Sequence, residues 1–278
     1  MLAPAIHGSD EILSWTIAPS VLIGFGLWTL AYVYLTGHMR KRRNWGAPPS
    51  RGQQTAFHSA TLIAVLALIS PIDHIGDEYL FSAHMLQHLL LMFVSAPLWL
   101  AGMPSWLMQA LVLERIETPA YWLTRPLIAF LIFSAAMSVW HVPFLYNLAF
   151  EHEWVHITEH LMYMAAAVIG WWPIAGPDVE FAPRPAPPAR MLYIFLLAMP
   201  CTALASFLTF AKAPLYPFYV SAPRILPLSV MADQQLGGLL MWLPTHMILL
   251  LAFSITFFRW FNALGKDKKE ASPINATL

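Results

Sequence analysis

Seven apolar runs, each about as long as a membrane-spanning helix, divide this sequence of 278 residues. A helix needs about 20 residues to cross ~30 Å of hydrocarbon, because each residue advances the chain by about 1.5 Å. Hydrophobic residues make up 58% of the chain and charged residues only 11%. The pattern predicts an all-α, polytopic membrane protein, a seven-transmembrane helix bundle that forms one membrane domain over residues 1–278, with spans at about residues 15–36, 56–71, 82–101, 127–146, 156–173, 191–211 and 235–261.

The basic residues predict how the chain is oriented. All 15 Lys and Arg residues except Lys212 and Arg224 lie in the tail or in the loops after the first, third and fifth runs. Cytoplasmic loops of membrane proteins carry an excess of Lys and Arg. We therefore expect the N-terminus outside and the C-terminus in the cytoplasm. The first run has no basic residue before it, so we expect it to be retained as a span rather than cleaved as a signal.

Two histidine pairs with the same spacing stand at the outer ends of two predicted spans. His84 and His88 open the third run, and His156 and His160 open the fifth. Residues four apart share one face of a helix, so each pair can point at a common centre. An ionisable side chain at membrane depth costs at least about 2.5 kcal/mol on insertion scales, which marks it as a functional candidate. Neutral imidazole binds copper, zinc and iron, so the pairs predict a metal site.

Other polar residues on the predicted outer side could complete this site. His141 lies near the outer end of the fourth run, and we expect it to be a further ligand. His152 is in helical register with the second pair but has a glutamate on each side, as a wetted loop would, so the sequence leaves its role open. Groups that could ligate the metal or orient the imidazoles are Asp73, Gln87, Glu159, Asp233 and Gln234.

Sulfur-containing residues give a weaker indication of the metal. Thioethers favour Cu(I), but a single methionine more often fills a gap between helices than binds a metal. We therefore give little weight to the methionines in or beside these runs. The single cysteine, Cys201, excludes an internal disulfide and a CxxC pair, and its apolar surroundings favour a packing role. The methionines concerned are Met85, Met92, Met137, Met162, Met164, Met231 and Met241.

Five short motifs follow one another in a characteristic order. They are Ser70-Pro-Ile-Asp73, His84-Met-Leu-Gln-His88, Trp140-His-Val-Pro143, His156-Ile-Thr-Glu-His160 and Asp233-Gln-Gln-Leu-Gly-Gly238. In these motifs the chain resembles the seven-span CtaG family, whose members are assembly factors for haem-copper cytochrome c oxidase. The resemblance implies a multi-pass protein of the bacterial cytoplasmic membrane that binds a copper ion and acts on an oxidase subunit. The ten candidate site residues named above all fall on motif positions.

Several functions are compatible with a histidine cluster in a membrane. The leading hypothesis is a copper-binding assembly factor, a metallochaperone without enzymatic turnover. Copper import is the alternative, although no continuous polar track follows the spans. A membrane di-iron oxygenase is the enzyme alternative, but the cluster is on the outer side and the sequence lacks an HxxHH box. A haem carrier would need only two of the histidines. No nucleic-acid motif occurs, and lipids are the other expected partners.

Overall fold

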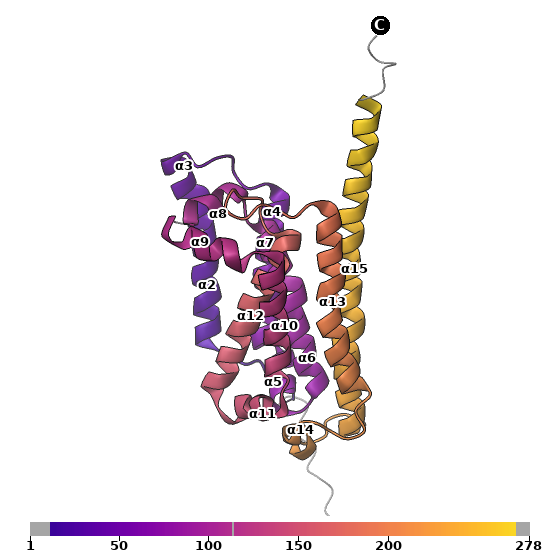
Figure 1. Ribbon diagram of the computed structural model, residues 1–278. Helices are drawn as coiled ribbons and strands as arrows, with labels where there is room; N and C mark the ends of the chain where they lie inside the picture. Colours follow the sequence, from indigo (N-terminus) through magenta and orange to yellow (C-terminus); the bar gives the residue numbers. More distant parts are fainter. Residues whose placement is uncertain (1–11, 113, 271–278) are drawn as a thin grey trace, which may run out of the picture.

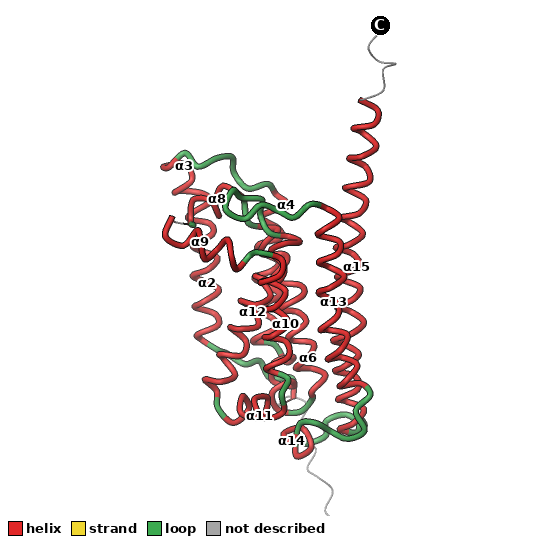
Figure 2. The backbone as a smooth tube through the Cα atoms, in the orientation of Figure 1, coloured by secondary structure: helices red, strands yellow, loops and turns green. Residues whose placement is uncertain are grey.

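The structure, a computed structural model, describes residues 12–112 and 114–270, and the regular structure in these ranges is helical (Figure 1, Figure 2). Two of the helical segments, η1 and η2, are π-helical turns. In chain order the elements are α2 (Pro19–Tyr34), η1 (Leu35–Met39), α3 (Arg40–Arg43), α4 (Arg51–Ile69), α5 (Pro71–Glu78), α6 (Phe81–Leu89), η2 (Leu90–Ser95), α7 (Ala96–Gly102), α8 (Ser105–Leu111), α9 (Glu114–Leu123), α10 (Pro126–Trp140), α11 (Pro143–Glu151), α12 (Glu153–Ala175), α13 (Pro187–Thr209), α14 (Pro217–Ser221) and α15 (Val230–Glu270).

The long helices make the chain a multi-pass membrane protein. Within the described residues, five helical stretches are long and apolar enough to cross a membrane. The helices of residues 116–123 and 126–140, bent by 73° at a short break, would make a sixth if they form one span. The count of seven spans and the orientation stay predictions, and residues 1–11 lie outside the described part of the chain. The five stretches are Pro19–Arg43, Arg51–Ile69, Phe81–Gly102, Pro187–Thr209 and Val230–Lys266.

One predicted boundary is wrong. The fourth run was expected to continue as a helix to Tyr146, but α10 ends at Trp140 and α11 begins at Pro143. Proline lacks a backbone N–H and disfavours helical geometry in the residue before it. Val142 is accordingly extended, with φ −65° and ψ 124°. The break leaves His141 at the C-terminal end of α10, beside the start of a new helix.

The two ends of the bundle differ in the elements that gather there. Figure 1 places α5, α11 and α14 at one end, and α3, α8 and α9 at the other, from which the C-terminal part of α15 projects. The helices α13 and α15 lie side by side along the bundle (Figure 1). Because α6 follows α5 and α12 follows α11, the N-terminal ends of α6 and α12 lie at the same end as α5, α11 and α14. This is where both histidine pairs are found.

The π-helical turn η2 changes the hydrogen bonds in the middle of the third predicted span. Ala96 N–H donates to Leu91 O, five residues back, instead of to Met92 O as in a regular α-helix. The carbonyl of Met92 instead accepts a hydrogen bond of 3.0 Å from the indole N–H of Trp171 in α12. The turn thereby joins the middle of the third predicted span to α12 near its C-terminal end.

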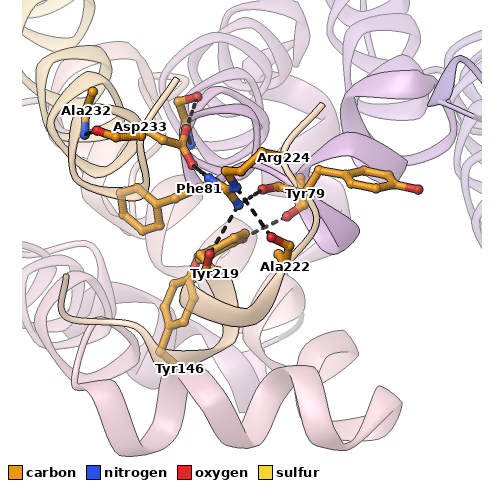
Figure 3. Close-up of polar contacts among 11 residues, drawn as sticks. Tyr79, Phe81, Tyr146, Tyr219, Ala222, Arg224, Ala232 and Asp233 are labelled. Carbon is orange, nitrogen blue, oxygen red and sulfur yellow. Dashed lines mark hydrogen bonds and ion pairs between the residues drawn. The ribbon is translucent and has the colours of Figure 1, made fainter. Parts of the chain in front are cut away.

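A buried carboxylate fixes the start of α6. Asp233 of α15 is 0% exposed and accepts hydrogen bonds from the backbone N–H of Phe81 (2.9 Å) and Ser82 (3.1 Å) and from the Ser82 hydroxyl (2.6 Å) (Figure 3). The Arg224 guanidinium lies 3.7 Å away and also donates to Tyr79 O. A carboxylate at the first turn satisfies N–H groups that have no partner within the helix. Asp233 therefore sets the position of the helix that carries the first histidine pair.

Candidate metal centre

Four imidazoles from two helices converge at one end of the bundle. The ring centroids of His84 and His88 on α6 are 4.2 Å apart, and those of His156 and His160 on α12 are 4.4 Å apart. Between the helices, the ring centroids of His84 and His156 are separated by 5.5 Å and those of His88 and His160 by 5.2 Å. Candidate ligand nitrogens of His84, His88 and His160 all lie within 4.8 Å of one another. The helical spacing of the two pairs thus produces one cluster, which we call the outer cluster.

The outer cluster contains buried nitrogens without hydrogen-bond partners among the described residues. His84 is 0% exposed, His88 5% and His160 8%. Buried polar atoms in folded proteins almost always have a partner, so a group of orphaned nitrogens calls for an explanation. A cation held by their lone pairs would supply one. The unpartnered atoms are His84 Nε2, both ring nitrogens of His88, His156 Nε2 and His160 Nε2.

Asp77, which the sequence analysis missed, joins the two helices at this cluster. Its carboxylate accepts a hydrogen bond of 3.3 Å from His84 Nδ1 and lies 3.7 Å from His156 Nδ1. Donation from Nδ1 leaves the lone pair of His84 on Nε2, where a metal could bind. Burial of Asp77 raises the pKa of its carboxyl to about 6, and the nearby His156 opposes the rise. Asp77, His84 and His156 also bring ligand atoms within 4.8 Å of one another.

A glycine allows α5 to approach α6 closely enough for this contact. A Cβ on Gly76 would lie 2.9 Å from His84 N and 3.0 Å from His84 Cα. Both of these are backbone atoms and cannot turn away as a side chain could. Any other residue at position 76 would therefore push α5 from α6 and move Asp77 away from His84.

Four of the predicted supporting residues make their hydrogen bonds away from the imidazoles. Gln87 donates to Asp73 Oδ1 (2.7 Å) and to Ala67 O (3.0 Å), which ties α6 to α5 and α4. Asp233 caps α6 as described above. Gln234 accepts from Leu215 N (2.7 Å) and donates to Leu208 O, so it fixes the loop after α13. These residues hold the helices in place rather than orient the histidine rings.

The remaining candidates have distinct surroundings. Glu159, between the second pair on α12, is 1% exposed, and neither carboxyl oxygen has a hydrogen-bond partner among the described residues. His141 donates from Nδ1 to Met137 O (2.7 Å), and its Nε2 is buried without a partner. It is not among the histidines whose nitrogens lie within 4.8 Å of one another. His152 is exposed and belongs to neither of these groups.

Comparison with known proteins shows which family the chain belongs to. The sequence model of the family described as cytochrome c oxidase caa3 assembly factor (CtaG) matches residues 30–263, which include both histidine pairs, Asp77 and Asp233. The chain belongs to this family. The family membership predicted from the motifs is thereby confirmed.

Relatives of this CtaG-family chain include long mycobacterial proteins. An uncharacterised protein of Mycobacterium leprae is 24% identical over 257 residues, which cover 86% of this chain and 38% of the relative. Uncharacterised proteins of Mycobacterium bovis and Mycobacterium tuberculosis are each 24% identical over 269 residues, covering 90% of this chain and 40% of the relative. The chain thus spans about two fifths of the length of these curated relatives. No solved structure matches it.

The contact of Asp77 with two imidazoles leads to a first prediction for this CtaG-family protein. Changing Asp77 to alanine should lower the affinity of the outer cluster for copper by about 10–100-fold, because groups that orient ligating histidines have effects of this size. Glu78→Ala is the matched control, since the neighbouring Glu78 is exposed. Titration of the purified variants with copper measures the effect. Equal affinities of the two variants would show that Asp77 does not support the site.

Proposed function

We propose that this protein is a membrane assembly factor that holds copper at the outer cluster and supports maturation of a metal centre in a caa3-type cytochrome c oxidase. The observation that carries the proposal is the convergence of four imidazoles, three of them buried, each with at least one ring nitrogen that has no hydrogen-bond partner among the described residues. Imidazole nitrogens suit copper, and the histidines and Asp77 provide enough donors to enclose one ion. Copper is cargo in this function, so the role is assembly rather than catalysis.

We also propose that the cluster faces the outer side of a bacterial cytoplasmic membrane, with α10 and α12 completing seven spans. The basic helix α3 (Arg40–Arg43) lies at the same end as α8, α9 and the projecting part of α15 (Figure 1). The histidines of the outer cluster lie at the opposite end. The positive-inside rule assigns the basic end to the cytoplasm, which supports an outward-facing cluster. An oxidase subunit with its metal centre on that side is the partner this arrangement favours.

Exposure within the cluster indicates how copper enters and leaves. The side chains of Asp77 and His156 are 28% and 16% exposed, whereas that of His84 is 0% exposed. Water and a partner can therefore reach the Asp77 and His156 edge first, and an ion would exchange one ligand at a time toward the buried histidines. Release to a partner by the reverse exchange needs no bond chemistry in the protein.

The alternative of copper import has less support. Import would need further ligands between the outer cluster and the basic end of the bundle. Two of the candidates for such ligands have other partners: Cys201 lies 3.6 Å from Leu197 O, and His246 hydrogen-bonds to Trp242 O and to the hydroxyl of Thr202. The contact between His246 and Thr202 joins α15 to α13, and the other two contacts lie within single helices.

A cellular experiment tests the proposed function against import. In a strain that depends on this protein, His84→Ala should lower the activity of assembled oxidase and leave cytoplasmic copper unchanged. The exposed His152, changed to alanine in parallel, should have no effect on either quantity. Full oxidase activity with His84→Ala would contradict the assembly role, and a fall in cytoplasmic copper would favour import.

A further inference from the structure

A second group of possible metal ligands lies deeper in the bundle than the outer cluster. A small cavity of about 20 Å³ lies against His88, on the side of η2 and away from Asp77. This volume is enough for a single water-sized guest. The sulfur-bearing and imidazole residues that line it are Met85, His88, Met92, Met137, His141 and Met241.

The methionines of this cavity come from three separate parts of the bundle. Met85 and Met92 belong to α6 and η2, Met137 to α10 and Met241 to α15, and all four are buried, with exposures of 1%, 1%, 4% and 7%. By contrast, Met162, on α12, is 46% exposed and does not line the cavity. Single methionines fill gaps in many cores, but four that meet around one cavity place several thioether donors together.

The imidazoles supply a second, independent observation. His141 donates its Nδ1 hydrogen to Met137 O, so its neutral ring carries the free lone pair on Nε2. That nitrogen is buried and has no hydrogen-bond partner among the described residues, and the same is true of both nitrogens of His88. Two buried imidazoles with unused lone pairs therefore border the methionine-lined cavity. His88 belongs both to this cavity and to the outer cluster.

We propose that this cavity is a binding site for a soft monovalent cation, Cu(I), held by thioethers of Met92, Met137 and Met241 with imidazole from His88 or His141. Thioether ligands select Cu(I) over harder ions. His88 would pass the ion between the two sites by ligand exchange. Copper stays in the +1 state throughout, so the exchange needs neither an oxidant nor a reductant. The proposal deepens the proposed function, on which it rests for copper as the cargo.

X-ray absorption on the full chain in lipid nanodiscs, loaded with Cu(I) under anaerobic conditions, tests the site. The wild type should show copper–sulfur scattering. The triple variant Met92→Leu, Met137→Leu and Met241→Leu should lose this scattering and bind Cu(I) about tenfold or more weakly, as loss of donors to a metal predicts. Leucine is close to methionine in volume, so the packing should survive. Met162→Leu is the matched control and should behave as the wild type.

Two outcomes would overturn the inference: a wild-type spectrum without sulfur scattering, or a triple variant that retains it. If the triple variant does not fold, Met241→Leu alone should lower the number of sulfur ligands, and an unchanged number would count against the site. The double variant His84→Ala, His160→Ala separates the two proposals. Sulfur scattering that persists in it, without copper at the outer cluster, supports the inner site. Copper bound by imidazole alone in the wild type would leave the proposed function standing and the inner site refuted.

Discussion

Changing both His84 and His160 to alanine should abolish copper binding at the outer cluster. These residues supply two of the three imidazoles whose nitrogens lie within 4.8 Å of one another, one from each helix. Loss of a group that only orients a metal ligand lowers metal affinity by about 10–100-fold, and loss of two ligands should lower it further. Metal content after dialysis, together with copper titration, measures the change.

The fold of this double variant should remain intact. Removing His84 Nε2 and His160 Nε2 breaks no protein hydrogen bond, because neither atom has a partner among the described residues. Removing His84 also breaks its hydrogen bond of 3.3 Å from Nδ1 to Asp77, but the Asp77 carboxylate is 28% exposed and can bind water instead. The metal-free double variant should therefore still fold, with a single thermal unfolding transition at a temperature below that of the wild type. The exposed His152, changed to alanine, is the matched control for the loss of an imidazole. Copper retained at the wild-type level in the double variant would show that the ion is held elsewhere.

Changing Asp233 to alanine should have the largest effect on stability. The substitution removes the acceptor for two backbone N–H groups and the Ser82 hydroxyl, and leaves Arg224 without its carboxylate (Figure 3). Breaking a buried ion pair costs about 3–5 kcal/mol, although the partial exposure of Arg224, 26%, places the expected loss near the lower figure. Unfolding in detergent micelles, followed by circular dichroism, measures the loss.

Two further variants locate the origin of that effect. Asp178→Ala, at an exposed carboxylate that accepts a bond from Arg184 N, should cost less than about 1 kcal/mol. Asp233→Asn keeps an acceptor for α6 but loses the charge, so its stability should lie between those of the wild type and Asp233→Ala. Equal free energies of unfolding for Asp233→Ala and Asp178→Ala would contradict the capping role of Asp233.

The arrangement of the histidines was predictable because helical periodicity is a local property. A spacing of four residues places His84 with His88, and His156 with His160, wherever their helices lie. Whether the two pairs meet depends on how α6 and α12 pack in the bundle. The sequence indicated only that both pairs lie on the same side of the membrane. The order of the short motifs predicted the family correctly, since those motifs extend over most of the matched region.

Features that depend on tertiary contacts were not predictable in the same way. Asp77 lies beyond the predicted second span, and its role arises from the approach of α5 to α6 at Gly76. Its spacing of four from Asp73 was the available signal. Asp233 and Gln87 were expected to ligate the metal or to orient the imidazoles, whereas in the structure they hydrogen-bond to backbone groups of neighbouring helices. The methionines looked unremarkable singly, because only the fold shows which of them share a cavity.

The metal bound to the purified full chain tests the central claim most directly. The protein should be isolated from cells grown with copper, and its metal content and X-ray absorption spectrum recorded for the wild type and for the double variant His84→Ala, His160→Ala. The outer-cluster account predicts copper with imidazole scattering in the wild type and fewer imidazole ligands per copper in the variant. Two iron ions per chain, a haem absorption band, or copper whose imidazole scattering is the same in both proteins would contradict it.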